Sequence, residues 1–366
     1  MPNARPLLHL IAGARPNFMK IAPMVRALQQ DGRLRFELVH TGQHFDRDMN
    51  DVFFEELGIP QPDVRLGCGG GTQAEQTGKI MLAYEQLLQS SRPDCCVVVG
   101  DVTSTLACAL VAKKAGIPVA HVEAGLRSGD QLMPEEINRL VTDAITDWFF
   151  ITEPSGRLHL EREGKPGDRL YDVGHVMVDN LLYQQAKLVA HPQPDALKDQ
   201  LGRYAVVTLH RPSNVDGEAN LRRALGVVNA LAEDLPVIFP MHPRTRKSLE
   251  THGIDVGKNV HLLPPQPYMA FLNLWRDAAL VLTDSGGLQE ETTALGVPCV
   301  TMRETTERPV TVDEGSNVLA GTDPATVLAA CRTVLSGQGK QGRRPALWDG
   351  KAAERIVAIL AERLGA

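Results

Sequence analysis

The sequence is poor in the features that mark membrane, secreted and nucleic-acid-binding proteins. Its 366 residues carry a formal net charge of -6, so no excess of basic residues favours a nucleic acid or a membrane surface as a partner. No apolar run approaches the roughly 20 residues that cross a bilayer. The apolar run 7–12 is too short for a signal peptide and is soon followed by Arg15. The sequence therefore predicts a cytoplasmic protein with no nucleic-acid or membrane partner.

Cysteine is scarce and follows no metal-binding pattern. The six cysteines form no Cys-x-x-Cys pair and lack the histidine spacing of zinc sites. Cys95 and Cys96 begin the apolar segment 95–99, which is typical of a buried strand. We expect reduced thiols buried in the core and no metal site.

Two common nucleotide-binding signatures are also missing. Gly78-Lys79 suggests a phosphate-binding P-loop, but Gln73 stands in place of its first glycine and Ile80 in place of its Ser or Thr. No Gly-x-Gly-x-x-Gly motif follows a predicted strand, which argues against a nicotinamide dinucleotide. We therefore expect no cofactor.

What the sequence does contain is a regular alternation of strands and helices. Short apolar segments predict strands at 7–11, 36–39, 95–99, 148–152, 205–209, 237–241, 280–283 and 298–302. Helical segments follow them over short loops, a pattern typical of parallel sheets covered on both faces. The length allows two domains. We predict an α/β protein with two Rossmann-like domains, 1–172 and 173–348, whose parallel sheets face a central cleft. A final helix within 349–366 is expected to pack back on the N-terminal domain.

Polar side chains follow these strands again and again. Ligands of open parallel sheets bind at the carboxyl ends of the strands. The residues found at those ends are Arg15, His44, Asp101, Glu123, His210, His242, Ser285 and Arg303. A single His or Asp at a strand end is usually an ordinary loop residue, but so many together favour a ligand site.

The stretch 121–139 concentrates acidic groups. It leaves an apolar strand, crosses a Gly-containing loop and starts a helix at Pro134, with Glu135 and Glu136 in the first turn. Proline and acids are ordinary at a helix start, so this stretch alone is equally compatible with a structural role. Glu123 comes within the same short segment, and Glu135 and Arg139 have i, i+4 spacing.

The segment 284–291 predicts a phosphate site. It reads as a strand end, a Gly-Gly turn and a helix start, and the free amides of such a start bind phosphate. Ser285 adds a hydroxyl group, Arg15 and Arg211 add positive charge, and Glu290 or Glu291 offers a carboxylate to a ribose. The alternative interpretation of Gly286-Gly287 is a tight turn without a ligand.

Taken in order, these motifs resemble one family, the non-hydrolysing UDP-N-acetylglucosamine 2-epimerases. The resemblance rests on the segments 13–23, 41–44, 100–101, 121–127, 134–139, 210–211, 242–243, 284–291 and 302–309. It implies the two-domain GT-B arrangement, usually dimeric, with UDP held mainly by the C-terminal domain. It also implies an isomerase of polysaccharide biosynthesis. This enzyme interconverts UDP-N-acetylglucosamine and UDP-N-acetylmannosamine by eliminating UDP to 2-acetamidoglucal and adding it back.

The resemblance also implies roles for individual residues. Those placed in catalysis are Asp101, Glu123 and Glu135 for proton transfer, His210 beside the leaving diphosphate, and Lys20. Those placed in substrate and UDP binding are Arg15, Arg139, His242, Ser285, Gly286, Gly287, Glu291 and Arg308.

The chain departs from the family pattern in two places. Asn17 stands where many members have Glu, and the loop 128–133 is short. In some members the longer loop helps to bind a second, activating substrate molecule, for which Gln43, His44 and Arg211 are the candidates here. Four alternatives stay open: a hydrolysing epimerase, an epimerase for a related UDP-diacetamido sugar acid, a GT-B glycosyltransferase, and a non-catalytic nucleotide-sugar binder.

Overall fold

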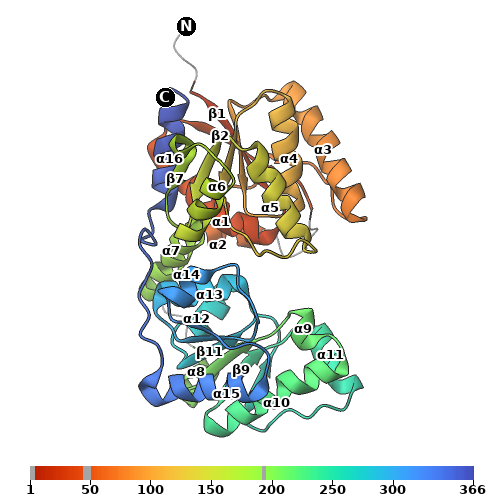
Figure 1. Ribbon diagram of the computed structural model, residues 1–366, viewed down its shortest axis with the longest axis vertical. Coiled ribbons are helices and arrows are strands. Elements are labelled where there is room, and N and C mark those ends of the chain that lie inside the picture. Colours follow the sequence, from red (N-terminus) through yellow and green to blue (C-terminus); the bar gives the residue numbers. More distant parts are fainter. Residues whose placement is uncertain (1–4, 44–50, 192–194) are drawn as a thin grey trace. The chain divides into compact units, whose positions relative to one another are not determined.

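The chain divides by its contacts into two compact units. The computed structural model describes residues 5–43, 51–191 and 195–366 (Figure 1). The first unit runs to Leu182 and includes the C-terminal segment Ala346–Ala366, and the second is Tyr183–Pro345. The boundaries expected from the sequence, 172/173 and 348/349, differ from this division by 10 and 3 residues. The assignment of two domains stays a prediction.

A seven-stranded parallel sheet forms the centre of the first unit, in the order β3-β2-β1-β4-β5-β6-β7. Its strands are β1 (Leu7–Ala12), β2 (Arg35–His40), β3 (Val64–Arg65), β4 (Cys95–Val99), β5 (Val119–Val122), β6 (Trp148–Ile151) and β7 (Leu170–Asp172). Its helices are α1 (Arg15–Asp31), α2 (Asp51–Leu57), α3 (Gln73–Ser90), α4 (Thr103–Lys114), α5 (Pro134–Ile145), α6 (Pro154–Arg162), the short η1 (Gly167–Arg169) and α16 (Ala352–Arg363). Helix α7 (Val176–Ala190) begins in this unit and ends in the second.

The central strand β4 is the buried strand that the apolar segment 95–99 predicts. All of its five residues are buried, as expected when helices cover both faces of a parallel sheet. The side chains of Cys96, Val98 and Cys108 pack with Ile80 and Tyr84 of α3 in one apolar cluster. All six cysteines are buried and free, and burial raises the pKa of Cys96 to about 12, which keeps it a thiol. The predicted strand and the predicted core thiols are confirmed.

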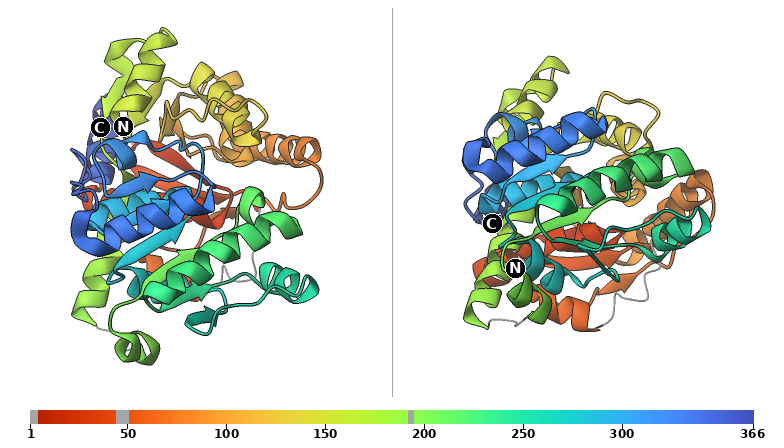
Figure 2. Two further views of the ribbon diagram at one scale, coloured as in Figure 1. Left: turned by 60° about the horizontal axis from the view of Figure 1, so that its bottom comes forward. Right: turned by 90° about the horizontal axis from the view of Figure 1, so that it is seen from below.

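A six-stranded parallel sheet forms the centre of the second unit, in the order β10-β9-β8-β11-β12-β13. Its strands are β8 (Ala205–Thr208), β9 (Val237–Pro240), β10 (Val260–Leu263), β11 (Leu280–Thr283), β12 (Cys299–Thr301) and β13 (Asn317–Leu319). Its helices are α8 (Ala196–Leu201), α9 (Pro212–Val215), α10 (Glu218–Asp234), α11 (Pro243–Thr251), α12 (Tyr268–Trp275), α13 (Gly286–Leu295), α14 (Pro309–Asp313), α15 (Pro324–Thr333) and η2 (Val334–Gln338). Helices α10 and α15 lie side by side and bury one apolar cluster with the strands (Figure 2). The predicted α/β class, with two parallel sheets, is confirmed.

The C-terminal segment returns to the first unit. Helix α16 packs against α1, and the indole of Trp348 donates to the carbonyl of Thr152 at 3.1 Å. At the start of α16 the amide of Ala353 donates to the carboxylate of Asp179, on α7, at 2.7 Å. Asp179 therefore caps a helix that lies more than 150 residues away along the chain.

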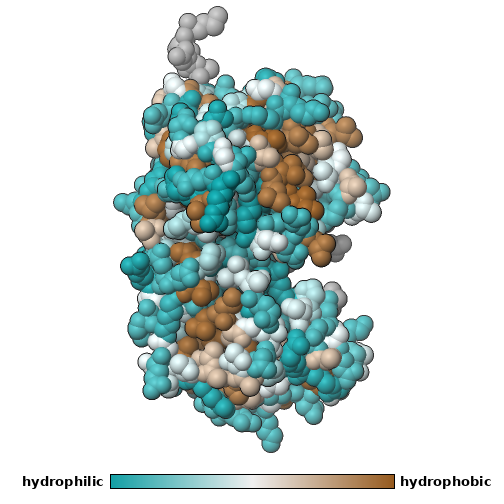
Figure 3. Space-filling model, viewed as in Figure 1, coloured by the Kyte–Doolittle hydropathy of each residue, from teal (hydrophilic) through white to brown (hydrophobic). Residues whose placement is uncertain are grey.

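The surface of the first unit carries exposed apolar side chains. Ile137 and Val141 on α5 are 49% and 37% exposed, and Figure 3 shows apolar residues gathered over the α4–α5 region. Among the described residues no helix combines the length and the hydrophobicity needed to span a membrane.

The Asp179 cap generates a prediction about stability. Burial raises the pKa of Asp179 to about 6 from an ordinary 3.8, so the folded chain holds this proton more tightly than the unfolded chain does. The ionised carboxylate therefore lowers the free energy of unfolding above pH 6, and this cost disappears as the pH falls towards 4. The Asp179→Asn variant has no such titration. Relative to it, the wild type should gain about 2 kcal/mol between pH 7.5 and pH 4.

Urea unfolding of both proteins across this pH range measures the difference. Because other titrating groups are the same in the two proteins, their effects cancel. A difference that does not change with pH would contradict the role given to Asp179.

Candidate functional site

Three neighbouring strands of the first unit bring polar residues to one edge of its sheet. Strands β1, β4 and β5 are adjacent, and their carboxyl ends lead into Arg15, Asp101 and Glu123. The guanidinium of Arg15 lies over the ring of Phe53, 5.1 Å from its centre. The residues predicted at these strand ends therefore come together at one edge, as the parallel topology requires.

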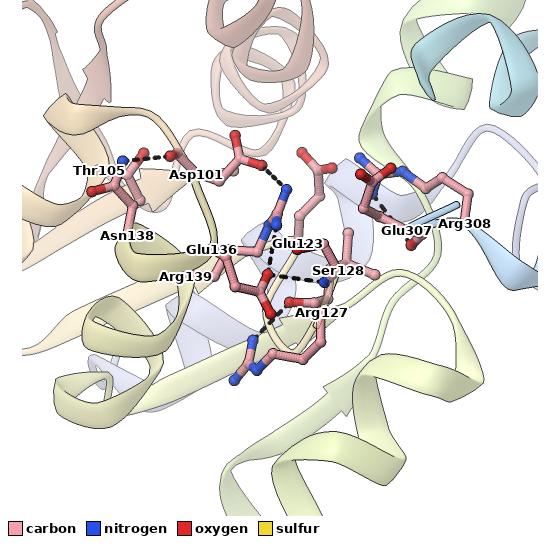
Figure 4. Close-up of polar contacts among 12 residues, drawn as sticks. Asp101, Thr105, Glu123, Arg127, Ser128, Glu136, Asn138, Arg139, Glu307 and Arg308 are labelled. Carbon is pink, nitrogen blue, oxygen red and sulfur yellow. Dashed lines mark hydrogen bonds and ion pairs between the residues drawn. The ribbon is translucent and has the colours of Figure 1, made fainter. Parts of the chain in front are cut away.

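Arg139 joins two carboxylates from different elements. Its Nη2 donates to Oδ2 of Asp101 at 2.5 Å, and its Nη1 donates to Oε2 of Glu136 at 2.7 Å (Figure 4). The side chain of Asp101 is 25% exposed, whereas those of Arg139 and Glu136 are 6% and 3% exposed. Asp101 is thus held by a buried cation while its carboxylate stays accessible to a ligand.

Glu136 also organises the loop before its helix. Its two carboxylate oxygens accept the amides of Ser128 and Gly129 at 2.9 and 3.1 Å. Burial alone would raise the pKa of Glu136, but these amides and Arg139 outweigh it and hold the pKa below its ordinary value. Glu136 is therefore an ionised anchor for the loop 128–133.

Glu123 combines an unusual backbone with a buried charge. Its φ of 69° lies in the left-handed region that non-glycine residues rarely adopt, and such strain gathers at functional sites. Its carboxylate forms an ion pair with Nζ of Lys20, on α1, and the two side chains are 1% and 14% exposed. A buried charge requires a partner of this kind. The backbone turn and the lysine together fix the direction of the Glu123 side chain.

Asn17 accounts for one departure from the family pattern. Its Oδ1 accepts the amides of Gly13 and Ala14 at 3.2 and 3.1 Å, and its Nδ2 donates to the carbonyl of Val99 at 3.1 Å. A glutamate at this position would need an acid proton to make the last contact. The amide side chain therefore ties the loop after β1 to the end of β4.

The structure places Glu135 and Gln43 differently from the other predicted residues. Glu135 is exposed at the start of α5, and Arg139 pairs with Glu136 three residues earlier rather than with Glu135 four residues earlier. Gln43 is buried, and its Oε1 accepts from the amide and hydroxyl of Ser104 at 3.0 and 2.8 Å. The proton-transfer role of Glu135 and the second-site role of Gln43 stay predictions. His44 lies outside the described residues.

A buried carboxylate gathers the corresponding edge of the second unit. Asp284 follows β11 and accepts the amides of His210 and Arg211, which follow the adjacent β8, at 3.0 and 2.9 Å. Nδ1 of His210 lies 2.9 Å from Oδ1 of Asp284, and Asn214 donates to Oδ2 at 3.0 Å. Burial would raise the pKa of Asp284, but these partners hold it below its ordinary value. The imidazole of His210 is therefore oriented by an ionised acid while 57% of it stays exposed.

The predicted phosphate-binding turn has an open helix start. Ser285 is the N-cap of α13, and its hydroxyl makes no capping hydrogen bond. A Cβ added at Gly286 or Gly287 would meet nothing within 4 Å, and neither residue has a positive φ. The fold itself therefore does not require glycine at either position, which favours a close ligand over the tight-turn interpretation.

Further charged residues of the second unit are tightly paired. Oε1 of Glu291 accepts the hydroxyl of Tyr268 at 2.8 Å, and Arg308 forms an ion pair with Glu290. Arg303 donates to Glu307 at 2.7 Å. Although burial opposes it, this arginine lowers the pKa of Glu307 to about 2. These pairs hold Glu291 and Arg308 in defined positions near the start of α13 and α14.

A cavity of about 420 Å³ lies beside His210 in the second unit. Its lining residues are His210, Pro212, Val215, Asp216, Gly217, His242, Thr245 and Ser248. His210 and His242 were both predicted at strand ends, and the structure brings them to one hollow. Arg211 is half-buried beside it in the chain.

The sequence did not reveal that the polar residues of α5 face inward and support the site. Glu136, Asn138, Arg139 and Asp143 are buried on α5, while Ile137 and Val141 are exposed. The signal for this inward polar face was present: 136, 139 and 143 have the i, i+3, i+7 spacing of one helix face. The role of Asp284 had a weaker signal, its position directly after a strand.

Comparison with known proteins identifies one family. A family model described as UDP-N-acetylglucosamine 2-epimerase matches residues 26–361. The UDP-N-acetylglucosamine 2-epimerase of Methanocaldococcus jannaschii is 39% identical over 362 residues, which cover 96% of this chain and 98% of that protein. The UDP-2,3-diacetamido-2,3-dideoxy-D-glucuronate 2-epimerase of Pseudomonas aeruginosa is also 39% identical, over 355 residues that cover 96% and 98%.

The three-dimensional comparison agrees. The crystal structure of the Methanocaldococcus jannaschii enzyme in complex with UDP-GlcNAc and UDP matches with a TM-score of 0.87 and 39% identity. The match covers 97% of this chain and 99% of that one. The family expected from the sequence is confirmed over nearly the whole chain.

Gly125 generates a prediction about the first site edge. Its φ is 82°, and an added Cβ would lie 2.2 Å from the carbonyl oxygen of Gly156. Gly129 in the same loop has a φ of 74° but nothing within 4 Å of its Cβ position. Gly129→Ala should lower the free energy of unfolding by about 1–2 kcal/mol from backbone strain alone.

Gly125→Ala should lower it by clearly more, because a backbone must also move. Thermal and urea unfolding of the two variants make the comparison. Equal losses for the two alanines would show that the contact with Gly156 does not constrain the loop.

Proposed function

The chain belongs to the UDP-N-acetylglucosamine 2-epimerase family, and from this premise we propose that it interconverts UDP-N-acetylglucosamine and UDP-N-acetylmannosamine without net release of UDP. The observation that carries the proposal is the edge of the first sheet. There, Asp101, paired with Arg139, follows β4, and Glu123, paired with Lys20, follows the adjacent strand β5. The relative from Methanocaldococcus jannaschii, with which the chain shares 39% of its residues, carries the name of this activity.

The proposed reaction is an elimination followed by an addition. A carboxylate of the first unit accepts the proton from the second sugar carbon, and the bond between the first carbon and the diphosphate breaks with its electron pair going to UDP. This leaves 2-acetamidoglucal. A proton is then delivered to the opposite face of the second carbon, and UDP re-forms its bond to the first carbon. Asp101, Glu123 and Glu135 are the proposed proton carriers.

The leaving diphosphate needs positive charge at the moment when the bond breaks. The imidazole of His210, held by Asp284 at 2.9 Å, is the proposed group beside the leaving diphosphate. The open start of α13, with Ser285, Gly286 and Gly287, offers amides to phosphate oxygens. Glu291 is the proposed ribose ligand. Lys20 is the remaining proposed catalytic residue, and the proposed binding set is completed by Arg15, Arg139, His242 and Arg308.

A second substrate is favoured by one specific observation. The diacetamido-glucuronate epimerase of Pseudomonas aeruginosa is as similar to this chain, at 39% identity, as the Methanocaldococcus jannaschii enzyme is. Its name specifies a sugar with a second acetamido group and an acidic carbon six. The same elimination and re-addition would serve both substrates. The homodimer and the cytoplasmic location expected from the sequence belong to the proposal as well.

Proton NMR in deuterated water tests the reaction. Incubated with UDP-N-acetylglucosamine, the enzyme should produce the manno epimer with deuterium at the second carbon and no stoichiometric UDP. The diacetamido glucuronate substrate is assayed in parallel, and the larger kcat/KM identifies the substrate. Accumulation of UDP and free N-acetylmannosamine would identify a hydrolysing enzyme instead.

Conservative variants test the residues. Asp101→Asn and Glu123→Gln should each lower kcat by about 100-fold or more, the usual size for a lost acid–base group, while UDP binding is retained. Asp31→Asn, which alters an acid paired with Arg33 at the end of α1 away from both residues, is the matched control and should keep kcat within about threefold. UDP affinity by calorimetry separates chemistry from binding. Unchanged turnover in the Asp101 and Glu123 variants would leave only a nucleotide-sugar binder.

A further inference from the structure

A fully buried histidine, two residues before Glu123, contacts the backbone next to Asp101. His121 is the third residue of β5 and is 0% exposed. Its Nδ1 lies 2.7 Å from Oδ1 of Asp143, and its Nε2 lies 2.8 Å from the carbonyl oxygen of Gly100. Neither contact takes part in the proposed proton transfers.

These two contacts define the protonation state of the ring. The carbonyl of Gly100 can only accept a hydrogen bond, so Nε2 must carry a hydrogen. An ionised Asp143 can also only accept, so Nδ1 must carry one too. A histidine with hydrogen on both nitrogens is an imidazolium. His121 is therefore a buried cation as long as Asp143 is ionised.

The surroundings of Asp143 favour the ionised form. Its second oxygen, Oδ2, lies 2.7 Å from Nη1 of Arg127 and accepts the amide of Gly125 at 3.0 Å. Complete burial would raise the pKa of Asp143, but His121 and Arg127 outweigh it and hold the pKa below its ordinary value. Arg127 is balanced in turn by Glu163, at 2.9 and 2.8 Å. The cluster alternates positive and negative charge throughout.

The cluster holds both reactive loops by their backbone. Gly100, with a φ of 68°, immediately precedes Asp101, and its carbonyl is the acceptor for His121. Gly125 lies two residues after Glu123, and its amide donates to Asp143. A shift of the His121–Asp143 pair would therefore move the turn of each carboxylate.

We propose that His121, as an imidazolium, and Asp143 are positioning residues for the proton transfers at the second sugar carbon. Through Gly100 they set the direction of Asp101, and through Gly125 they set that of Glu123. The inference rests on the proposed epimerase function. It assigns to the interior of α5 a role in the orientation of the acid–base groups, without contact with the substrate.

Removal of the ring contacts should lower turnover more than binding. His121→Phe keeps a ring of similar size but loses both hydrogen bonds, and Asp143→Ala removes the anchor of the pair. A misplacement of a reacting group by about 1 Å costs roughly 100-fold in rate. We expect each variant to lower kcat by about 100-fold, while KM and the Kd for UDP change by no more than about threefold.

A second buried histidine provides the matched control. His9 is the third residue of β1 in the same sheet and is also 0% exposed, but its ring contacts Tyr84 and Ser91 at 3.2 and 3.3 Å. His9→Phe therefore removes buried hydrogen bonds of the same sheet without touching the reactive loops. It should lower the melting temperature and leave kcat within about threefold of the wild type.

The conservative variant Asp143→Asn gives a readout that a purely structural role would not move. Its carbonyl oxygen still accepts from Gly125 and Arg127, and its amide group donates to Nδ1 of a neutral His121, which keeps Nε2–H for Gly100. At pH 8 this variant should recover kcat to within about tenfold of the wild type. Asp143→Ala offers no such replacement contact, so its kcat should stay about 100-fold below that of the wild type.

Nitrogen NMR of histidine-labelled enzyme tests the protonation state without any activity. In the wild type at pH 8 both ring nitrogens of His121 should carry hydrogen, and in Asp143→Asn only one. A neutral His121 in the wild type would overturn the inference, even if the Phe variant failed to fold. So would a folded His121→Phe enzyme with wild-type kcat, or an Asp143→Asn enzyme whose kcat is no higher than that of Asp143→Ala.

The wild-type assay separates this inference from the function on which it rests. A wild type that turns over neither UDP-sugar would contradict the proposed function. An active wild type whose His121 and His9 variants lose turnover equally would contradict the positioning role alone.

Discussion

The pairing of buried charges on the inner face of α5 is the constraint on which the first site edge depends. Glu136, Arg139 and Asp143 are at most 5% exposed, and each must find a partner because an isolated buried charge costs several kcal/mol. The partners lie on three other segments: Asp101 after β4, His121 in β5, and the loop 125–129. The need to neutralise one helix face thus fixes the position of the loops that carry the proposed acid–base groups.

In the second unit, one buried carboxylate gathers the neighbouring loops. Asp284 is fully buried and accepts the amides of His210 and Arg211 together with the side chain of Asn214. In both units a buried carboxylate collects backbone amides of neighbouring loops, which lowers its pKa and stiffens the loops. Asp101 is held by the buried Arg139 and His210 by the buried Asp284, and both of these proposed site residues keep an accessible face. A rigid support of this kind holds reacting groups in place without occupying the space of the ligand.

Much of this could be predicted from local patterns, and some could not. Apolar runs such as 95–99 identified buried strands, and the residues that follow them were correctly placed at the edges of parallel sheets. The pattern did not say that α5 turns its charged face inward, leaving Ile137 and Val141 exposed, because amphipathic spacing defines two faces but not which one meets the core. For the same reason the i, i+4 spacing of Glu135 and Arg139 did not decide the pairing, and Glu136 is the acid that Arg139 binds.

The sequence by itself determined the α/β class, the strands other than the edge strands β3, β7, β10 and β13, the family and the set of side chains that reach the strand ends. These follow from hydrophobic period and from short motifs, which are local along the chain. Only the tertiary structure decided which acid each arginine, lysine or histidine binds. It also decided that Gln43 bonds to the start of α4, and that His121 lies between Asp143 and the backbone of Gly100. Such pairings join residues tens of positions apart, and their choice depends on burial, where every charge and amide must be satisfied at once.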